Sequence, residues 1–182
     1  MDVSIKLKDL GLLMSCLALL EHEVSKFFFK ISEKLAGYVS IAISHVALES
    51  KNHGEILKRI SKGLIATEEI NEEICREVCG TSWENIMNVL RTSIKDLEGI
   101  TSKDIKQIIS LLEKNLDFES FTNEEMYVGS LLPLISSVIK QKKIPQLELV
   151  TLIIEEIAEE EKFHLEILKK VVDELKSLYL TS

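Results

Sequence analysis

Apolar residues recur at intervals of three and four along almost the whole chain, which is the spacing of one face of an α-helix. The pattern predicts two long helices in the amino-terminal part, over about residues 4–36 and 38–62. Gly37 stands between them and is a natural helix stop. Because so short a connection joins helices that lie side by side, we expect an antiparallel hairpin.

A second pair of long helices is predicted in the carboxyl-terminal part. The first follows Thr122, and Pro133 falls inside its pattern, which predicts a kink or a later start. Pro145 suits the first turn of the second helix, which runs to about Tyr179. The apolar stripe of the first of these helices reads Val128, Leu131, Leu132, Ile135, Val138 and Ile139.

The segment between the two hairpins, about residues 64–120, reads as three shorter helices. Thr81 and Glu84 have the spacing of a capping box at the start of one of them. The prediction is therefore a single all-α domain over residues 1–182. It consists of a hairpin over about 4–62, an inserted helical segment and a hairpin over about 122–179, and the two hairpins form an antiparallel four-helix bundle.

Composition supports a helical, globular chain and limits its partners. The 182 residues are 46% apolar, with seven glycines and two prolines, too few turn residues for a β-sandwich. The formal net charge is −8 and no dense basic stripe is present, which argues against a nucleic acid partner. No apolar stretch is long enough to span a bilayer, and we expect no membrane partner. The apolar run Leu10 to Leu20 merges into Glu21 without a signal-peptide cleavage site, so we expect a cytoplasmic protein.

The three cysteines are predicted to be small buried hydrophobic residues. Cys75 and Cys79 are four residues apart and share a helix face, so a redox pair or a soft-metal site is the alternative for them. Cys16 lies far from both in the sequence, and the paired CxxC spacing of a zinc ribbon is absent.

Candidate chemistry concentrates at Glu161 and His164. They are three residues apart and point the same way, on the helix face that also carries Ile154, Ile157 and Leu168. A charge on an inward face usually has a partner or a metal, since an unpaired buried charge is costly. The alternative is a hydrogen-bonded buried pair without metal.

Weaker signals of the same kind lie on the other predicted helices. His53 faces inward three residues after Ser50, and Glu21 and Glu125 occur early in the two hairpins. Each has a simpler explanation. His53 would then be a hydrogen-bonded core residue, Glu21 a surface residue, and Glu125 the partner of Thr122 in a capping box.

This ordered set of carboxylates and histidines resembles the ferritin-like superfamily, particularly rubrerythrin-type di-iron carboxylate proteins. That family takes one Glu from each of two helices and a Glu-x-x-His from each of the other two. The resemblance implies metal ligands at Glu21, His53, Glu125 or its neighbour Glu124, Glu161 and His164.

Ser50 departs from the family pattern, which has a bridging Glu there. Glu49, one turn before His53 on a neighbouring face, is the candidate substitute. With Glu49 in the place of the missing carboxylate, the resemblance implies a di-iron site. Without it, the resemblance implies a mononuclear iron site, another divalent metal such as zinc, or no metal.

The resemblance implies a metal-binding, iron-containing protein, and an oxidoreductase acting on peroxide or dioxygen is the activity it suggests. A homo-oligomer and an electron-donor protein are the partners it leaves open. The first alternative is a metal-free helical bundle that kept the fold as a structural module. The second is a helical module whose inserted segment presents a surface to a protein partner.

Overall fold

The computed structural model describes residues 3–65, 70–142 and 145–180. All regular elements in these ranges are helices, as the sequence predicts, and they are connected by short turns. The α-helices are α1 (Val3–Ser32), α2 (Gly37–Leu64), α3 (Glu72–Asp96), α4 (Ile105–Phe121), α5 (Leu132–Lys142) and α6 (Pro145–Leu180). A 3₁₀ turn, η1 (Leu97–Gly99), follows α3, and a π-helix, η2 (Thr122–Leu131), lies between α4 and α5.

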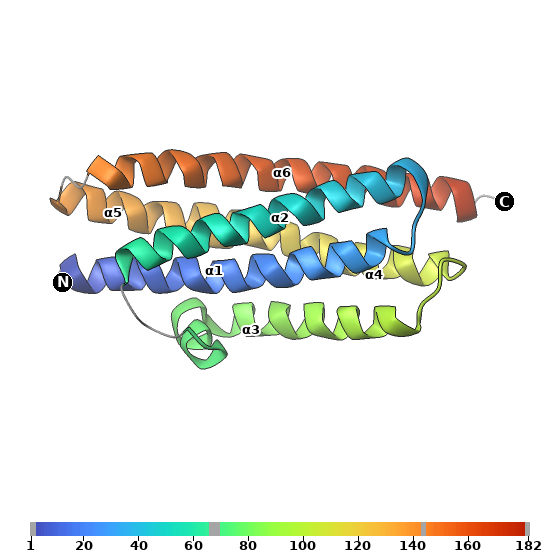
Figure 1. Ribbon diagram of the computed structural model, residues 1–182, viewed down its shortest axis with the longest axis horizontal. Coiled ribbons are helices and arrows are strands. Elements are labelled where there is room, and N and C mark those ends of the chain that lie inside the picture. Colours follow the sequence, from blue (N-terminus) through green and yellow to red (C-terminus); the bar gives the residue numbers. More distant parts are fainter. Residues whose placement is uncertain (1–2, 66–69, 143–144, 181–182) are drawn as a thin grey trace.

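Helices α1 and α2 form the predicted amino-terminal hairpin and pack along most of their length (Figure 1). Helix α1 ends at Ser32, earlier than predicted, and Gly37 begins α2 with φ at 66°. Side chains other than glycine rarely adopt this left-handed conformation, so Gly37 allows the sharp reversal. The hairpin is held by the Ser40 hydroxyl, which donates to the Ser32 carbonyl oxygen over 2.8 Å.

Helices α4 and α5 are joined by η2 into one continuous helical segment, which differs from the predicted start after Thr122. Pro133 lies in the first turn of α5, directly after the π-helix. Proline has no N–H, so Pro133 cannot donate the hydrogen bond to the residue four positions before it. The wider turns of the π-helix lie directly before this missing bond. The segment therefore runs without a break from the predicted insert into the second hairpin.

The α4–η2–α5 segment and α6 run antiparallel, and α6 also contacts α2 (Figure 1). The core between α1, α2, α6 and the α4–η2–α5 segment contains large buried side chains such as Leu17, Phe28 and Ile154. Helix α3 lies outside this group and packs chiefly on α1 (Figure 1). Gly80 breaks it with φ at 77°, where the sequence predicts one short helix to end and another to begin.

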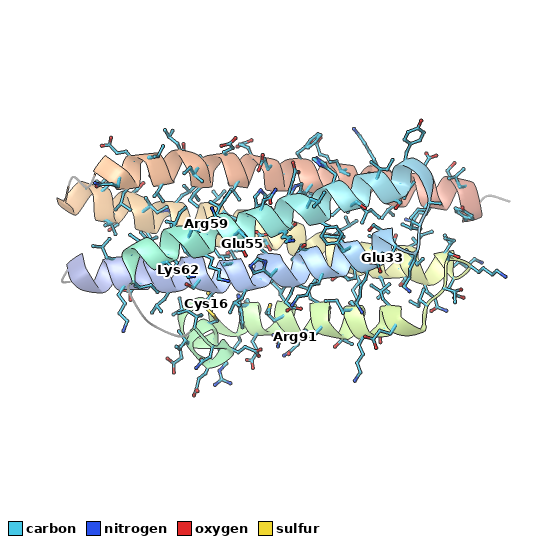
Figure 2. All side chains as sticks on the ribbon, in the orientation of Figure 1. Cys16, Glu33, Glu55, Arg59, Lys62 and Arg91 are labelled. Carbon is cyan, nitrogen blue, oxygen red and sulfur yellow. A yellow bond between two sulfur atoms is a disulfide. The ribbon has the colours of Figure 1, made fainter. Side chains whose placement is uncertain are left out.

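The cysteine prediction is wrong for two of the three residues. Cys16 on α1 and Cys75 on α3 form a buried disulfide, with their Cα atoms 5.3 Å apart, and Figure 2 shows Cys16 on the side of α1 that faces α3. The Trp83 indole N–H donates to the Cys16 carbonyl oxygen over 3.1 Å at the same contact. Cys79 is a free, partly buried cysteine. Sequence spacing places Cys75 and Cys79 on one helix face. The packing of α3 on α1 instead brings Cys75 to Cys16, which is 59 positions away.

None of the helices within the described ranges has the length and apolar character needed to cross a bilayer. The cytoplasmic location stays a prediction. Disulfides are typical of oxidising compartments, with intracellular proteins of hyperthermophiles as an exception.

Candidate metal centre

Four polar side chains from three helices meet in the apolar core. They are Glu21 on α1, His53 on α2, and Glu161 and His164 on α6, with exposed fractions of 2% or less. The helical period puts each of them on the inward face of its helix. The packing of α2 on α6 then joins positions more than 100 residues apart, and the structure brings together four of the six residues that the sequence predicts.

Glu161 lies between the two histidines. Its Oε1 accepts a hydrogen bond from His53 Nδ1 over 2.7 Å and lies 3.4 Å from His164 Nδ1. The two imidazole rings stack, with centroids 5.6 Å apart and planes inclined by 23°. The same nitrogen of each ring therefore lies near one carboxylate oxygen.

The other nitrogen of each ring is held by a partly exposed carboxylate. His53 Nε2 donates to Glu160 Oε2 over 2.8 Å, and His164 Nε2 donates to Glu49 Oε2 over 2.7 Å. Carboxylates of this kind fix the tautomer and the orientation of a histidine whose other nitrogen binds a metal. Glu49, the predicted substitute for a bridging carboxylate, here contacts the outer side of His164. Glu160 lies next to the predicted motif, but sequence reasoning did not find it, because periodicity places it on the flank of the helix.

Glu21 has a partner that the sequence analysis missed. The Tyr127 hydroxyl donates to Glu21 Oε1 over 2.6 Å, and Tyr127 is fully buried. The predicted stripe of this region contained Val128, which is 46% exposed. A π-helix turns less per residue than an α-helix, so η2 shifts the inward face to Met126 and Tyr127. A period of 3.6 cannot reveal this shift.

The structure does not bring the remaining predicted residues into this group. Glu125 is exposed on η2. The side chain of Glu124 lies outside the described residues. Ser50 is fully buried, and its hydroxyl donates to the Val46 carbonyl oxygen over 3.0 Å, as a serine commonly does inside a helix.

Burial and charge shift the ionisation of the site. Burial and the charge of Glu161 raise the pKa of Glu21 from 4.5 to about 8, against the opposing effects of His53 and the Tyr127 hydroxyl. Burial by itself would lower the pKa of His53, but the hydrogen bond to Glu161 and the charge of Glu21 outweigh it and raise this pKa from 6.5 to about 9. The pKa of His164 is also raised, because Glu161 and Glu49 outweigh its burial. Folding therefore favours the protonated form of each of these groups.

The donor atoms fit a divalent metal ion. One ligand atom each from His53, Glu161 and His164 lies within 4.8 Å of the other two. Because such an ion lies about 2.0–2.2 Å from imidazole and carboxylate ligands, small side-chain movements would bring all three onto it. Among the described residues, the buried Nδ1 of His164 has no hydrogen-bond partner. A metal ion would satisfy this nitrogen, which is otherwise unfavourable in an apolar interior.

No protein-family model, curated protein or solved structure matches the chain. The geometry of the site and the physical chemistry of its residues therefore carry the functional argument.

Proposed function

We propose that the protein binds a divalent transition metal through His53, Glu161 and His164, with Glu21 as a further carboxylate beside them. The observation that carries this proposal is that Nδ1 of both buried imidazoles lies within 3.4 Å of Glu161 Oε1, while Nδ1 of His164 lacks a hydrogen bond. A purely structural core gains nothing from placing two imidazoles and two carboxylates in one apolar interior, since each must be desolvated.

Iron is the metal that this donor set favours. Two histidines and one carboxylate with open positions are typical of non-haem Fe(II), although zinc and other divalent ions also accept these ligands. Bound iron would supply one-electron chemistry toward peroxide or dioxygen. The chain itself contributes a water-poor interior, because Glu21, Tyr127, His53 and His164 are almost completely buried.

A single ion per chain is supported better than a pair. The position expected to bridge two ions is Ser50, whose hydroxyl is used by the Val46 carbonyl oxygen. Glu125 is exposed, and Glu49 contacts the outer nitrogen of His164. The number of carboxylates that face the site is therefore small for a dinuclear centre.

The ferritin-like bundle belongs to this proposal as its scaffold. The antiparallel hairpin of α1 and α2, together with the antiparallel pair of the α4–η2–α5 segment and α6, supports it (Figure 1). In this arrangement α3 is an addition on the outer side of α1.

The alternative is a metal-free bundle that serves as a structural or protein-interaction module. It is favoured by Ser50 and by His53, since both ring nitrogens of His53 already have carboxylate partners within the chain. The two functions differ in one measurable property, which is metal affinity.

The test is elemental analysis of the purified protein, followed by an anaerobic titration of the metal-free protein with ferrous iron. We expect saturation at a single ion per chain, and loss of tight binding in His164→Gln and Glu161→Gln. His22→Gln is the matched control, because His22 is partly exposed and its Nε2 lies 3.6 Å from Glu55 Oε1, which does not contact the site residues. Circular dichroism confirms that each variant is folded. The proposal is refuted if the wild-type chain binds no ion. It is also refuted if wild type and His164→Gln bind the ion with equal affinity.

A further inference from the structure

The candidate metal centre has one closed end and one open end. At the closed end, Glu21 contacts Tyr127, and both side chains are buried. At the open end, Glu49 and Glu160 contact the outer nitrogens of the two histidines, and their side chains are 27% and 43% exposed. Polar atoms thus connect the interior to the surface along the seam between α2 and α6.

Glu49 also joins the site to an exposed histidine. Its Oε2 lies 2.7 Å from Nε2 of the buried His164 and 3.2 Å from Nε2 of His45, whose side chain is 48% exposed. His45 and Glu49 are four residues apart on α2 and so share one face, the spacing at which helices hold metal ions with two side chains. The link from His45 to the inner site appears only when α2 packs on α6, because this packing brings Glu49 to His164.

A cation that reaches the interior has to lose water, which is unfavourable unless protein ligands replace that water stepwise. At the closed end, no described polar group of the site is exposed. At the open end, His45 and Glu49 offer a nitrogen and an oxygen at the surface, and the same Glu49 oxygen is already in contact with a ligand of the inner site. An ion bound by His45 and Glu49 would therefore lie next to His164 of the inner site.

We propose that a divalent cation reaches the buried site through the seam between α2 and α6, and that His45 and Glu49 are its first ligands. This inference rests on the proposed function, since it assigns a route to that same site. His45 acts on the rate of metal uptake alone. Glu49 acts on the rate and, through its hydrogen bond to His164, also on the affinity that His53, Glu161 and His164 determine.

The experiment follows the binding of Co²⁺ to the full-length metal-free protein by stopped-flow absorbance, and measures the equilibrium affinity separately. The variants are His45→Gln and Glu49→Gln. The matched control is Glu159→Gln, which removes one negative charge from the exposed part of α6, where Glu159 pairs with Lys162. Association is measured at low and moderate ionic strength, because electrostatic attraction at an exposed site is screened by salt.

We expect Glu49→Gln to slow association by about tenfold, since local charge changes association rates by this order. We expect His45→Gln to slow association and dissociation by the same factor, because a ligand used only on the route alters both rates and leaves the equilibrium constant unchanged. Glu159→Gln should associate at the wild-type rate.

Two outcomes would overturn the route while leaving the proposed function intact. One is tight Co²⁺ binding with equal association rates in wild type, His45→Gln and Glu159→Gln. The other is slower association only in Glu160→Gln, which would place the route on the His53 side. If wild type binds no Co²⁺ at equilibrium, the proposed function and this inference both fail.

Discussion

The hydroxyl of Tyr127 donates a hydrogen bond to Glu21 Oε1 over 2.6 Å in the core, at the closed end of the candidate metal centre. Glu21 comes from α1, and Tyr127 from the π-helix that precedes α5. The pair gives the buried carboxyl a donor, and the surrounding apolar side chains keep water from both groups. This contact explains how Glu21 is retained in an interior where a lone carboxyl would be unfavourable.

Removing this hydroxyl should destabilise the protein. Tyr127→Phe keeps the ring and deletes the donor, so that Glu21 loses a hydrogen bond inside the core. We expect the free energy of unfolding to fall by about 1–3 kcal/mol. Urea denaturation measures this change. Tyr38→Phe is the control, because Tyr38 is 91% exposed and its change should stay within about 0.5 kcal/mol. Equal effects of the two substitutions would contradict the role given to Tyr127.

The stability of the metal-free protein should decrease with rising pH. Folding raises the pKa of His53 from 6.5 to about 9 and that of Glu21 from 4.5 to about 8, so the folded state binds more protons than the unfolded chain in these windows. The stabilisation from His53 is complete below pH 6.5 and is lost as the pH rises to about 9. Glu21 acts in the same direction from pH 4.5 to about 8.

The measurement is urea denaturation across this pH range in the presence of a chelator. His53→Gln should flatten the curve above pH 6.5. A free energy of unfolding that increases from pH 6.5 to pH 9 would contradict the assigned shifts. Saturating metal should weaken the dependence, since ligation displaces these protons.

A carboxylate at Ser50 should make stability depend on metal. Ser50 is fully buried one turn before His53, so Ser50→Glu adds a charge to the core. Without metal, we expect a loss of about 3–5 kcal/mol, the size of an uncompensated buried charge. Ferrous iron should recover much of this loss, because an ion that binds only the folded state stabilises it.

Ser50→Gln separates size from charge, since it adds a similar volume without a carboxylate. Melting temperatures with and without ferrous iron give the comparison. If iron raises the melting temperature of Ser50→Gln as much as that of Ser50→Glu, the added carboxylate does not act on the metal.

Gly54 sets the close approach of α1 and α2 next to His53. A Cβ at this position would lie 2.9 Å from His22 Cε1 and 3.1 Å from the Ala18 carbonyl oxygen, and the backbone of α1 cannot easily move away. Gly54→Ala should therefore destabilise the protein by about 1–3 kcal/mol through overpacking. Gly63→Ala is the control on the same helix, where a Cβ meets nothing within 4 Å, and it should stabilise by up to about 1 kcal/mol. If Gly54→Ala raises the melting temperature as Gly63→Ala does, the contact at Gly54 is not tight.

The Cys16–Cys75 disulfide should contribute strongly to stability. It joins α1 to α3 across 59 positions, and a loop of this length gives about 4 kcal/mol in the chain-entropy model. Reduction with a dithiol should lower the free energy of unfolding by this order, as measured by urea denaturation. Cys79→Ala should behave like wild type before and after reduction. Burial raises the pKa of the Cys79 thiol to about 12, so this thiol stays protonated and exchanges slowly with the disulfide. An unchanged stability after complete reduction would contradict this role.

The long helices and the inner residues of the site follow from local rules. The helical period places Glu161, His164 and His53 on inward faces, and Gly37 and Pro145 mark turns between helices. These predictions need only the spacing of residues within one helix, which the amino-acid order determines by itself.

The contacts between helices were decided by the tertiary structure. The π-helix turned Tyr127 toward Glu21, and the approach of α2 to α6 brought Glu49 to His164. The packing of α3 on α1 joined Cys16 to Cys75. Periodicity shows which face of a helix is buried, but the partner on that face depends on the register and rotation of another helix. These are determined by side-chain packing over the whole core, which no local pattern in the sequence contains.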